Sequence, residues 1–117
     1  MLLDDAMDAL EAADPNTFYG TANALPKGAP WDFTVLKRGS IRRTGGKTGY
    51  SDSLVVVIVR ERYIPDGLAE RVVEAMEQLP GINLVKESEH PFDYEVNPQT
   101  GNTCEMLTLS FARARKS

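Results

Sequence analysis

Six apolar residues follow one another without interruption in Leu54-Val55-Val56-Val57-Ile58-Val59, and the charged Arg60-Glu61-Arg62 comes directly after them. A continuous run rich in β-branched residues is typical of a strand that is covered on both faces. The next segment, Ile64-Pro65-Asp66-Gly67, has the composition of a turn. We therefore predict a strand over residues 53–63 that lies in the middle of a sheet and emerges into water at its end.

Two amphipathic helices are predicted, one before and one after this strand. Residues 67–79 place apolar side chains at helical spacing, and Asp66 is positioned to cap the first turn. The apolar stripe consists of Leu68, Val72, Val73, Met76 and Leu79. Residues 2–13 show the same spacing, with acidic residues between the apolar ones.

Four further strands are expected from period-two alternation or short apolar runs, over residues 31–36, 82–86, 92–96 and 103–113. The connections are mostly too short for parallel crossovers. The sequence therefore predicts one α+β domain over residues 1–117, with a mostly antiparallel sheet of about five strands, two helices on one face, and the order α-β-β-α-β-β-β. Proline and glycine make residues 14–30 an irregular connector, and residues 113–117 are expected to form a flexible tail.

Charge is distributed unevenly along this chain, whose net charge is −4. The segment from residue 37 to 49 contains four glycines, no acid, and five basic residues, namely Lys37, Arg38, Arg42, Arg43 and Lys47. We predict a basic glycine-rich loop over residues 39–52 that projects from the sheet and contacts either a neighbouring subunit or DNA phosphates. The first helix carries the candidate acidic partner face, formed by Asp4, Asp5, Asp8 and Glu11. A solvated surface with uneven charge is the remaining explanation.

Each candidate motif for catalysis or metal binding lacks a residue or a neighbouring element that its chemistry needs. Gly45-Gly46-Lys47-Thr48 resembles part of a phosphate-binding loop, but Ile41 occupies the position of the first glycine and a strand, not a helix, follows. His90 is the only histidine and has no cysteine beside it, so a zinc site lacks ligands. Cys104 lies in a strand pattern and is expected to be a buried thiol. We predict no enzymatic activity, no cofactor and no metal.

Export and membrane insertion are not expected either. The longest apolar run is six residues, whereas a membrane-spanning helix needs about 20. The N-terminal region carries aspartates in place of a basic segment followed by an apolar one, so it does not have the pattern of a secretory signal.

Several of these features together resemble the small neck and tail-completion proteins of long-tailed bacteriophages, the tail terminator group above all. They are an acidic first helix, the strand from Trp31 to Arg38, the glycine-basic loop, the strand from Leu54 to Arg62 that closes on the turn at Ile64, and the final strand Met106-Leu107-Thr108-Leu109-Ser110-Phe111. The resemblance covers most of the chain and rests on architecture, so it carries over no individual residue.

The resemblance implies a structural virion protein, assembled in the cytoplasm of the bacterial host and located at the head–tail junction. Such a protein forms a ring, a hexamer in that group, which ends polymerisation of the tail tube and gives the head a docking surface. Its partners would be further copies of itself, the tail tube protein, a head-completion or connector protein, and DNA in the channel. A head-closure or other minor tail protein is an alternative, as is a small nucleic-acid-binding module that uses the basic residues 37–47.

Overall fold

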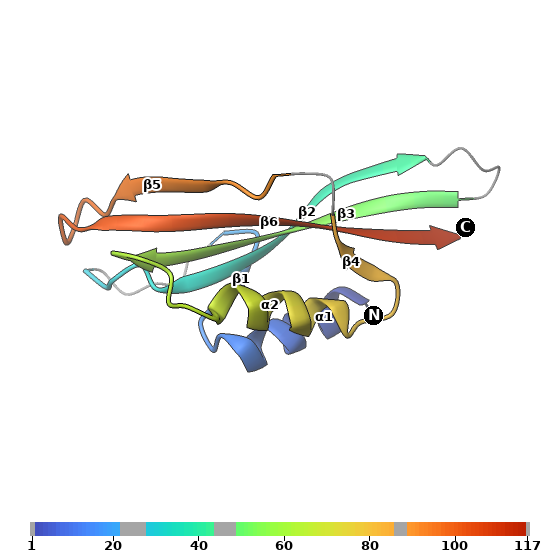
Figure 1. The fold of residues 1–117 in the computed structure, drawn as a ribbon, viewed down its shortest axis with the longest axis horizontal. Coiled ribbons are helices and arrows are strands. Elements are labelled where there is room, and N and C mark those ends of the chain that lie inside the picture. Colours follow the sequence, from blue (N-terminus) through green and yellow to red (C-terminus); the bar gives the residue numbers. More distant parts are fainter. Residues whose placement is uncertain (1, 22–27, 44–48, 86–88, 117) are drawn as a thin grey trace.

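A twisted sheet with two helices against one face forms the molecule (Figure 1). The computed structural model describes residues 2–21, 28–43, 49–85 and 89–116. The elements are α1 (Leu2–Ala13), β1 (Thr17–Tyr19), β2 (Phe33–Arg43), β3 (Gly49–Glu61), α2 (Leu68–Glu77), β4 (Ile82–Leu84), β5 (Phe92–Val96) and β6 (Thr103–Lys116). The predicted α+β class and the placement of both helices on one face are confirmed.

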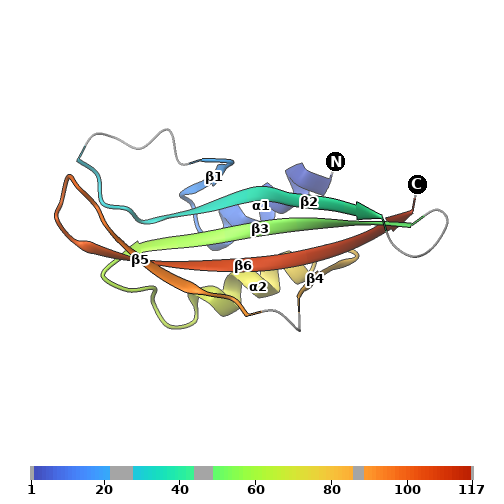
Figure 2. The same cartoon turned by 90° about the horizontal axis from the view of Figure 1, so that it is seen from above.

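The sheet has the order β1-β2-β3-β6-β4, and β5 also pairs with β6. As predicted, β3 is the central strand, and all strand pairs are antiparallel except β1 with β2. The outer edge of β6 is shared between two short strands, because β5 pairs with residues 103–107 and β4 with residues 111–113. Seen from above, α1 lies under the β1–β2 side of the sheet and α2 under the β6–β4 side (Figure 2).

The main core lies between the sheet and the helices. Ala6 and Leu10 of α1, and Val72 and Met76 of α2, have no exposed surface there. They pack with alternate residues of the strands, among them the completely buried Phe111. The period of 3.6 residues in the helices and of two in the strands thus brings their apolar faces together, as expected from the sequence.

A smaller apolar cluster covers the other face of the sheet. Phe33, Val35, Val57, Val59 and Cys104 are buried in it. The prediction of a buried thiol at Cys104 is confirmed, and this burial raises the pKa of the thiol. Apolar packing on both faces explains why the sequence of β3 is apolar without alternation.

The predicted loop over residues 39–52 is wrong for most of its length. Residues 39–43 continue β2 and residues 49–52 begin β3, while residues 44–48, which include Lys47, lie outside the described residues. The pairing continues past a one-residue bulge between Arg38 and Ile41. At Gly39 in this bulge an added Cβ would overlap Ser53 Oγ, so the close approach favours glycine.

Two other expectations of irregular structure are also corrected. Residues 113–116, predicted as a flexible tail, form the end of β6 and pair with residues 49–52. Strand β1 lies within the predicted irregular connector, where it adds a sixth strand parallel to β2. Ladder hydrogen bonds to a distant strand stabilise both segments, and local composition does not report such bonds.

Asp66 does not cap α2, contrary to the prediction. The N-cap position belongs to Gly67, whose φ of 87° is left-handed, and no side chain of the described residues caps the helix. Glycine adopts this conformation without strain. The Asp66 carboxylate is therefore left at the surface beside the start of the helix.

A buried ion pair joins the end of α1 to the sheet. Asp14 Oδ2 accepts hydrogen bonds from Arg60 Nη2 and from Thr34 Oγ1, both at 2.7 Å. The side chains of Asp14 and Arg60 are only 6% and 14% exposed. Arg60 Nη1 also donates to the carbonyl oxygen of Phe33 at 3.0 Å. Asp14 is thus an internal structural group and does not belong to the acidic surface of the N-terminal region.

Candidate functional site

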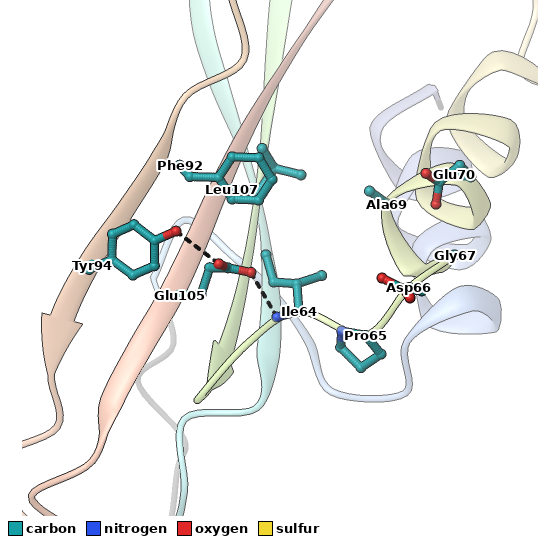
Figure 3. Close-up of a pocket in the computed structure, with 10 residues that line it drawn as sticks. All are labelled: Ile64, Pro65, Asp66, Gly67, Ala69, Glu70, Phe92, Tyr94, Glu105 and Leu107. Carbon is teal, nitrogen blue, oxygen red and sulfur yellow. Dashed lines mark hydrogen bonds between the residues drawn. The ribbon is translucent and has the colours of Figure 1, made fainter.

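A groove lies between β5 and the start of α2 (Figure 3). It has a volume of about 420 Å³. Strands β5 and β6 form one wall, and the turn before α2 with its first residues forms the other. The lining residues are Ile64, Pro65, Asp66, Gly67, Ala69, Glu70, Phe92, Tyr94, Glu105 and Leu107.

The wall formed by β5 is an exposed edge strand. Phe92, Tyr94 and Val96 are 52%, 60% and 58% exposed. Their register against β6 places them on the helix side of the sheet, since Phe92 pairs with the core residue Leu107. The helices do not cover them, so three large side chains that alternate as in a half-buried strand remain in solvent. Exposed apolar side chains on an edge strand are typical of a surface that binds another chain.

Carboxylates give the groove a negative character. Glu105 on β6 is held by two hydrogen bonds, because Oε1 accepts from the backbone N–H of Ile64 at 2.9 Å and Oε2 accepts from the Tyr94 hydroxyl at 3.0 Å (Figure 3). The bond to Glu105 raises the pKa of Tyr94. Asp66 and Glu70 are exposed on the opposite wall. Arg71 reaches the neighbourhood of Gly67, but the described lining contains no basic residue.

The basic residues predicted as a loop lie mainly on β2. We call residues 37–43 of this strand the basic arm; it contains Lys37, Arg38, Arg42 and Arg43. Lys37 and Arg38 are exposed. Strand β1 pairs only with residues 34–36, so among the described residues no strand pairs with the outer edge of the arm. The end of the arm and the C-terminal end of β6 lie at one end of the long axis, and β5 lies towards the other (Figures 1 and 2).

The candidate acidic face is exposed as the helical pattern requires. Asp4, Asp5, Asp8 and Glu11 all lie on the outer side of α1, away from Ala6 and Leu10. Within the described part of the chain, the single ion pair joins Asp14 to Arg60. The structure of one chain thus places the acidic face and the basic arm on separate elements and does not join them.

Sequence reasoning missed the groove, including Tyr94, Glu105, Asp66 and Glu70 as a group. The alternation of Phe92, Tyr94 and Val96 predicted the strand correctly. That pattern did not indicate that the apolar face would be left uncovered, because coverage depends on where α2 begins in space. The acids Asp66, Glu70 and Glu105 are the residues that could have indicated the site, but Glu105 is far from the other two in the sequence.

Glu61, at the end of β3, organises the turn of residues 97–102. Its carboxylate accepts hydrogen bonds from Asn102 Nδ2 at 2.8 Å, Asn97 Nδ2 at 2.7 Å, the Trp31 N–H at 3.1 Å and Thr100 Oγ1 at 3.0 Å. These bonds, that from Asn102 first, lower the pKa of Glu61 from 4.5 to about 2, against the opposing effect of burial. Glu61 therefore serves as a structural anion that connects the turn to the segment before β2.

This arrangement predicts an acid-dependent contribution to stability. Because the folded-state pKa of Glu61 is depressed, its contribution is present above pH 4.5 and lost as the pH falls towards 2. Glu61→Gln should lower the thermal unfolding midpoint at pH 7, and the gap to the wild type should close between about pH 4.5 and 2. Glu95→Gln, on the exposed strand β5, is the control and should show no such gap. A gap of equal size at all pH values would contradict the assignment.

Other chemical groups are already used within the fold. His90 contacts the carbonyl oxygen of Val85 with Nε2 at 3.0 Å and accepts from the Ser110 N–H with Nδ1 at 3.4 Å, so both ring nitrogens have backbone partners. The described residues contain no group of three or more His, Cys, Asp or Glu placed to hold a metal ion. Among the same residues, no helix is both long and apolar enough to cross a membrane.

No protein-family model matches the chain, and no curated protein matches its sequence.

Proposed function

We propose that this chain is a structural subunit of a bacteriophage virion, which forms a ring at the end of the tail tube, ends tube polymerisation and presents a docking surface for the head. The proposal combines the architectural resemblance with one observation, the two open and unlike edges of the sheet. One edge is the basic arm of β2, and the other is the exposed aromatic strand β5.

Two unlike edges favour head-to-tail contact. When one surface of a subunit binds a different surface of the next, the contact repeats, and it closes into a ring if the rotation between subunits allows. In the described sheet the basic arm lies on the β2 side and β5 on the β6 side, so each copy can offer one edge to each neighbour. This geometry supports a cyclic assembly rather than a two-fold dimer, which would use the same surface twice.

The first test is the oligomeric state of the purified protein. Negative-stain electron microscopy at high protein concentration should show rings with an open centre, and mass measurement at low and moderate salt should give the number of subunits. A protein that remains monomeric both alone and at the ends of purified tail tubes would contradict the proposal. Addition of the protein to polymerising tube subunits separates two roles, because a terminator shortens the tubes whereas a head-closure protein does not.

Charge reversal in the basic arm tests the same proposal in assembly. Arg42→Glu/Arg43→Glu should reduce head-joined particles by at least about tenfold, because like charges across a contact cost several kcal/mol. Thermal unfolding should show that the variant still folds. The control is Arg62→Glu, an exposed site directly after the end of β3 that is distant from the arm.

Normal infectious particles from the double variant would refute a role of the arm in assembly. A DNA-binding measurement on the same variants separates the nucleic-acid alternative. If wild-type affinity for DNA falls steeply with salt while no ring forms, the arm is a nucleic-acid contact and not a subunit contact.

A further inference from the structure

We propose that the groove between β5 and α2 is the docking site for the basic arm of a second copy of this chain. This inference rests on the proposed ring and specifies its subunit contact. It follows from the chemistry of the groove, from its distance to the arm of the same chain, and from the open edges of both strands.

The end of the basic arm, at Arg43, cannot reach the groove of its own chain. Arg43 pairs with Tyr50, and Tyr50 pairs with Arg115 on β6, whereas Phe92 pairs with Leu107. The end of the arm is therefore eight residues further along β6 than Phe92. At the rise of a strand this is about 26 Å, which exceeds the length of an arginine side chain several times. If the end of the arm enters such a groove, the groove must belong to another copy.

The groove has the chemistry that binds guanidinium groups. Glu105 is fixed by its bonds to Ile64 and Tyr94, so it presents a carboxylate with little loss of side-chain freedom on binding. Asp66 and Glu70 add negative charge on the facing wall, and neither belongs to the ion pair of the described chain. The rings of Phe92 and Tyr94 offer faces on which an arginine can stack.

Backbone geometry supports the same contact. The outer edges of β5 and of the basic arm have no strand partner among the described residues, and they lie on opposite margins of the sheet. An arm that lies along β5 of the next copy would add a strand to that sheet while its side chains meet the groove. This pairing would provide hydrogen-bond partners for the backbone groups of both exposed edges. Edges without such partners are prone to non-specific association.

The acidic face of α1 is a weaker acceptor for the arm. Asp4, Asp5, Asp8 and Glu11 lie on the outside of a helix, and none of them lines the groove between β5 and α2. Exposed ion pairs on such a surface contribute little to binding. The groove offers charge, aromatic faces and an open strand edge together, so it is the better partner.

A charge-swap experiment tests this contact directly. Asp66→Lys/Glu70→Lys should weaken association between copies, raising the dissociation constant roughly 100-fold. Analytical ultracentrifugation at moderate salt measures this change. Asp66 makes no cap of α2, so its replacement removes no helix-capping bond. Combining these changes with Arg42→Glu/Arg43→Glu in one chain should restore most of the association. Asp8→Lys/Glu11→Lys changes the net charge equally at exposed sites of α1, outside the groove lining and away from β5, and it should have little effect.

The outcomes separate this inference from the proposed function. If the wild type forms rings and the groove variants form them equally well, the groove is not the docking site although the ring proposal stands. If both double variants are impaired but their combination is not restored, the arm does not bind these carboxylates. If the groove variants associate normally and lose only binding to tail tubes, the occupant is the tube protein, and the inference is overturned. If the wild type assembles neither alone nor on tubes, the proposed function itself fails.

Discussion

Asp14→Ala is expected to lower the free energy of unfolding by about 3–5 kcal/mol, because it leaves the largely buried guanidinium of Arg60 without its counter-ion. The same substitution removes the acceptor of the Thr34 hydroxyl, which is completely buried. Chemical denaturation at neutral pH, followed by circular dichroism, measures the change. The effect is large for a domain of this size, whose total stability is typically about 5–15 kcal/mol.

Two further variants give this prediction its controls. Asp8→Ala removes an exposed carboxylate from α1 and should change stability by no more than about 0.5 kcal/mol. Asp14→Leu combined with Arg60→Met removes both charges, and it should recover much of the loss because no unpaired charge remains buried. If Asp14→Ala were as mild as Asp8→Ala, the ion pair would not be buried in solution.

Phe111→Ala should lower the free energy of unfolding by a similar amount, about 3–5 kcal/mol, because it opens a cavity in a closely packed core. Phe111 has no exposed surface and lies opposite Leu54 on β3 and Leu84 on β4. It thus connects the central strands to the short edge strand and to the helices. Chemical denaturation again measures the effect.

Phe92→Ala is the matched control, since it removes the same side chain from a site that is 52% exposed. It should change stability by less than about 1 kcal/mol, because little apolar area is buried around it. If the groove is the docking site, Phe92→Ala should also weaken association between copies. If Phe92→Ala destabilised the protein as much as Phe111→Ala, Phe92 would be buried in the monomer. Strand β5 would then not be an exposed edge that is free to bind another chain.

Local pattern was sufficient for most of the fold. The helix over residues 2–13 and the strand over residues 92–96 were predicted with their observed ends. The central position of β3 followed from its unbroken apolar run, which needs cover on both faces. These features depend on neighbours in the sequence, whose spacing fixes which side chains share a face.

The sequence pattern gave wrong predictions where a strand pairs with residues that are distant in the sequence. Glycine and charge made residues 39–43 and 49–52 resemble a loop, yet the pairing of β2, β3 and β6 extends through them. The strand ladder satisfies backbone groups whatever the side chains are, so composition underestimates the length of long strands. Asp14 is a further example, because nothing near it in the sequence indicates that the fold places it against Arg60, 46 residues away.

The sequence alone therefore determined the class of the fold, the order of its main elements and the presence of a concentrated basic segment. Tertiary structure decided which apolar residues remain in solvent and which charges are internal. The groove shows this most clearly. Asp66 lies in the turn before α2, Tyr94 on β5 and Glu105 on β6, and they line one groove only because β5 pairs with β6 and α2 packs against the sheet. Periodicity defines the faces of each element, but whether a face is covered depends on packing between elements that are far apart in the chain.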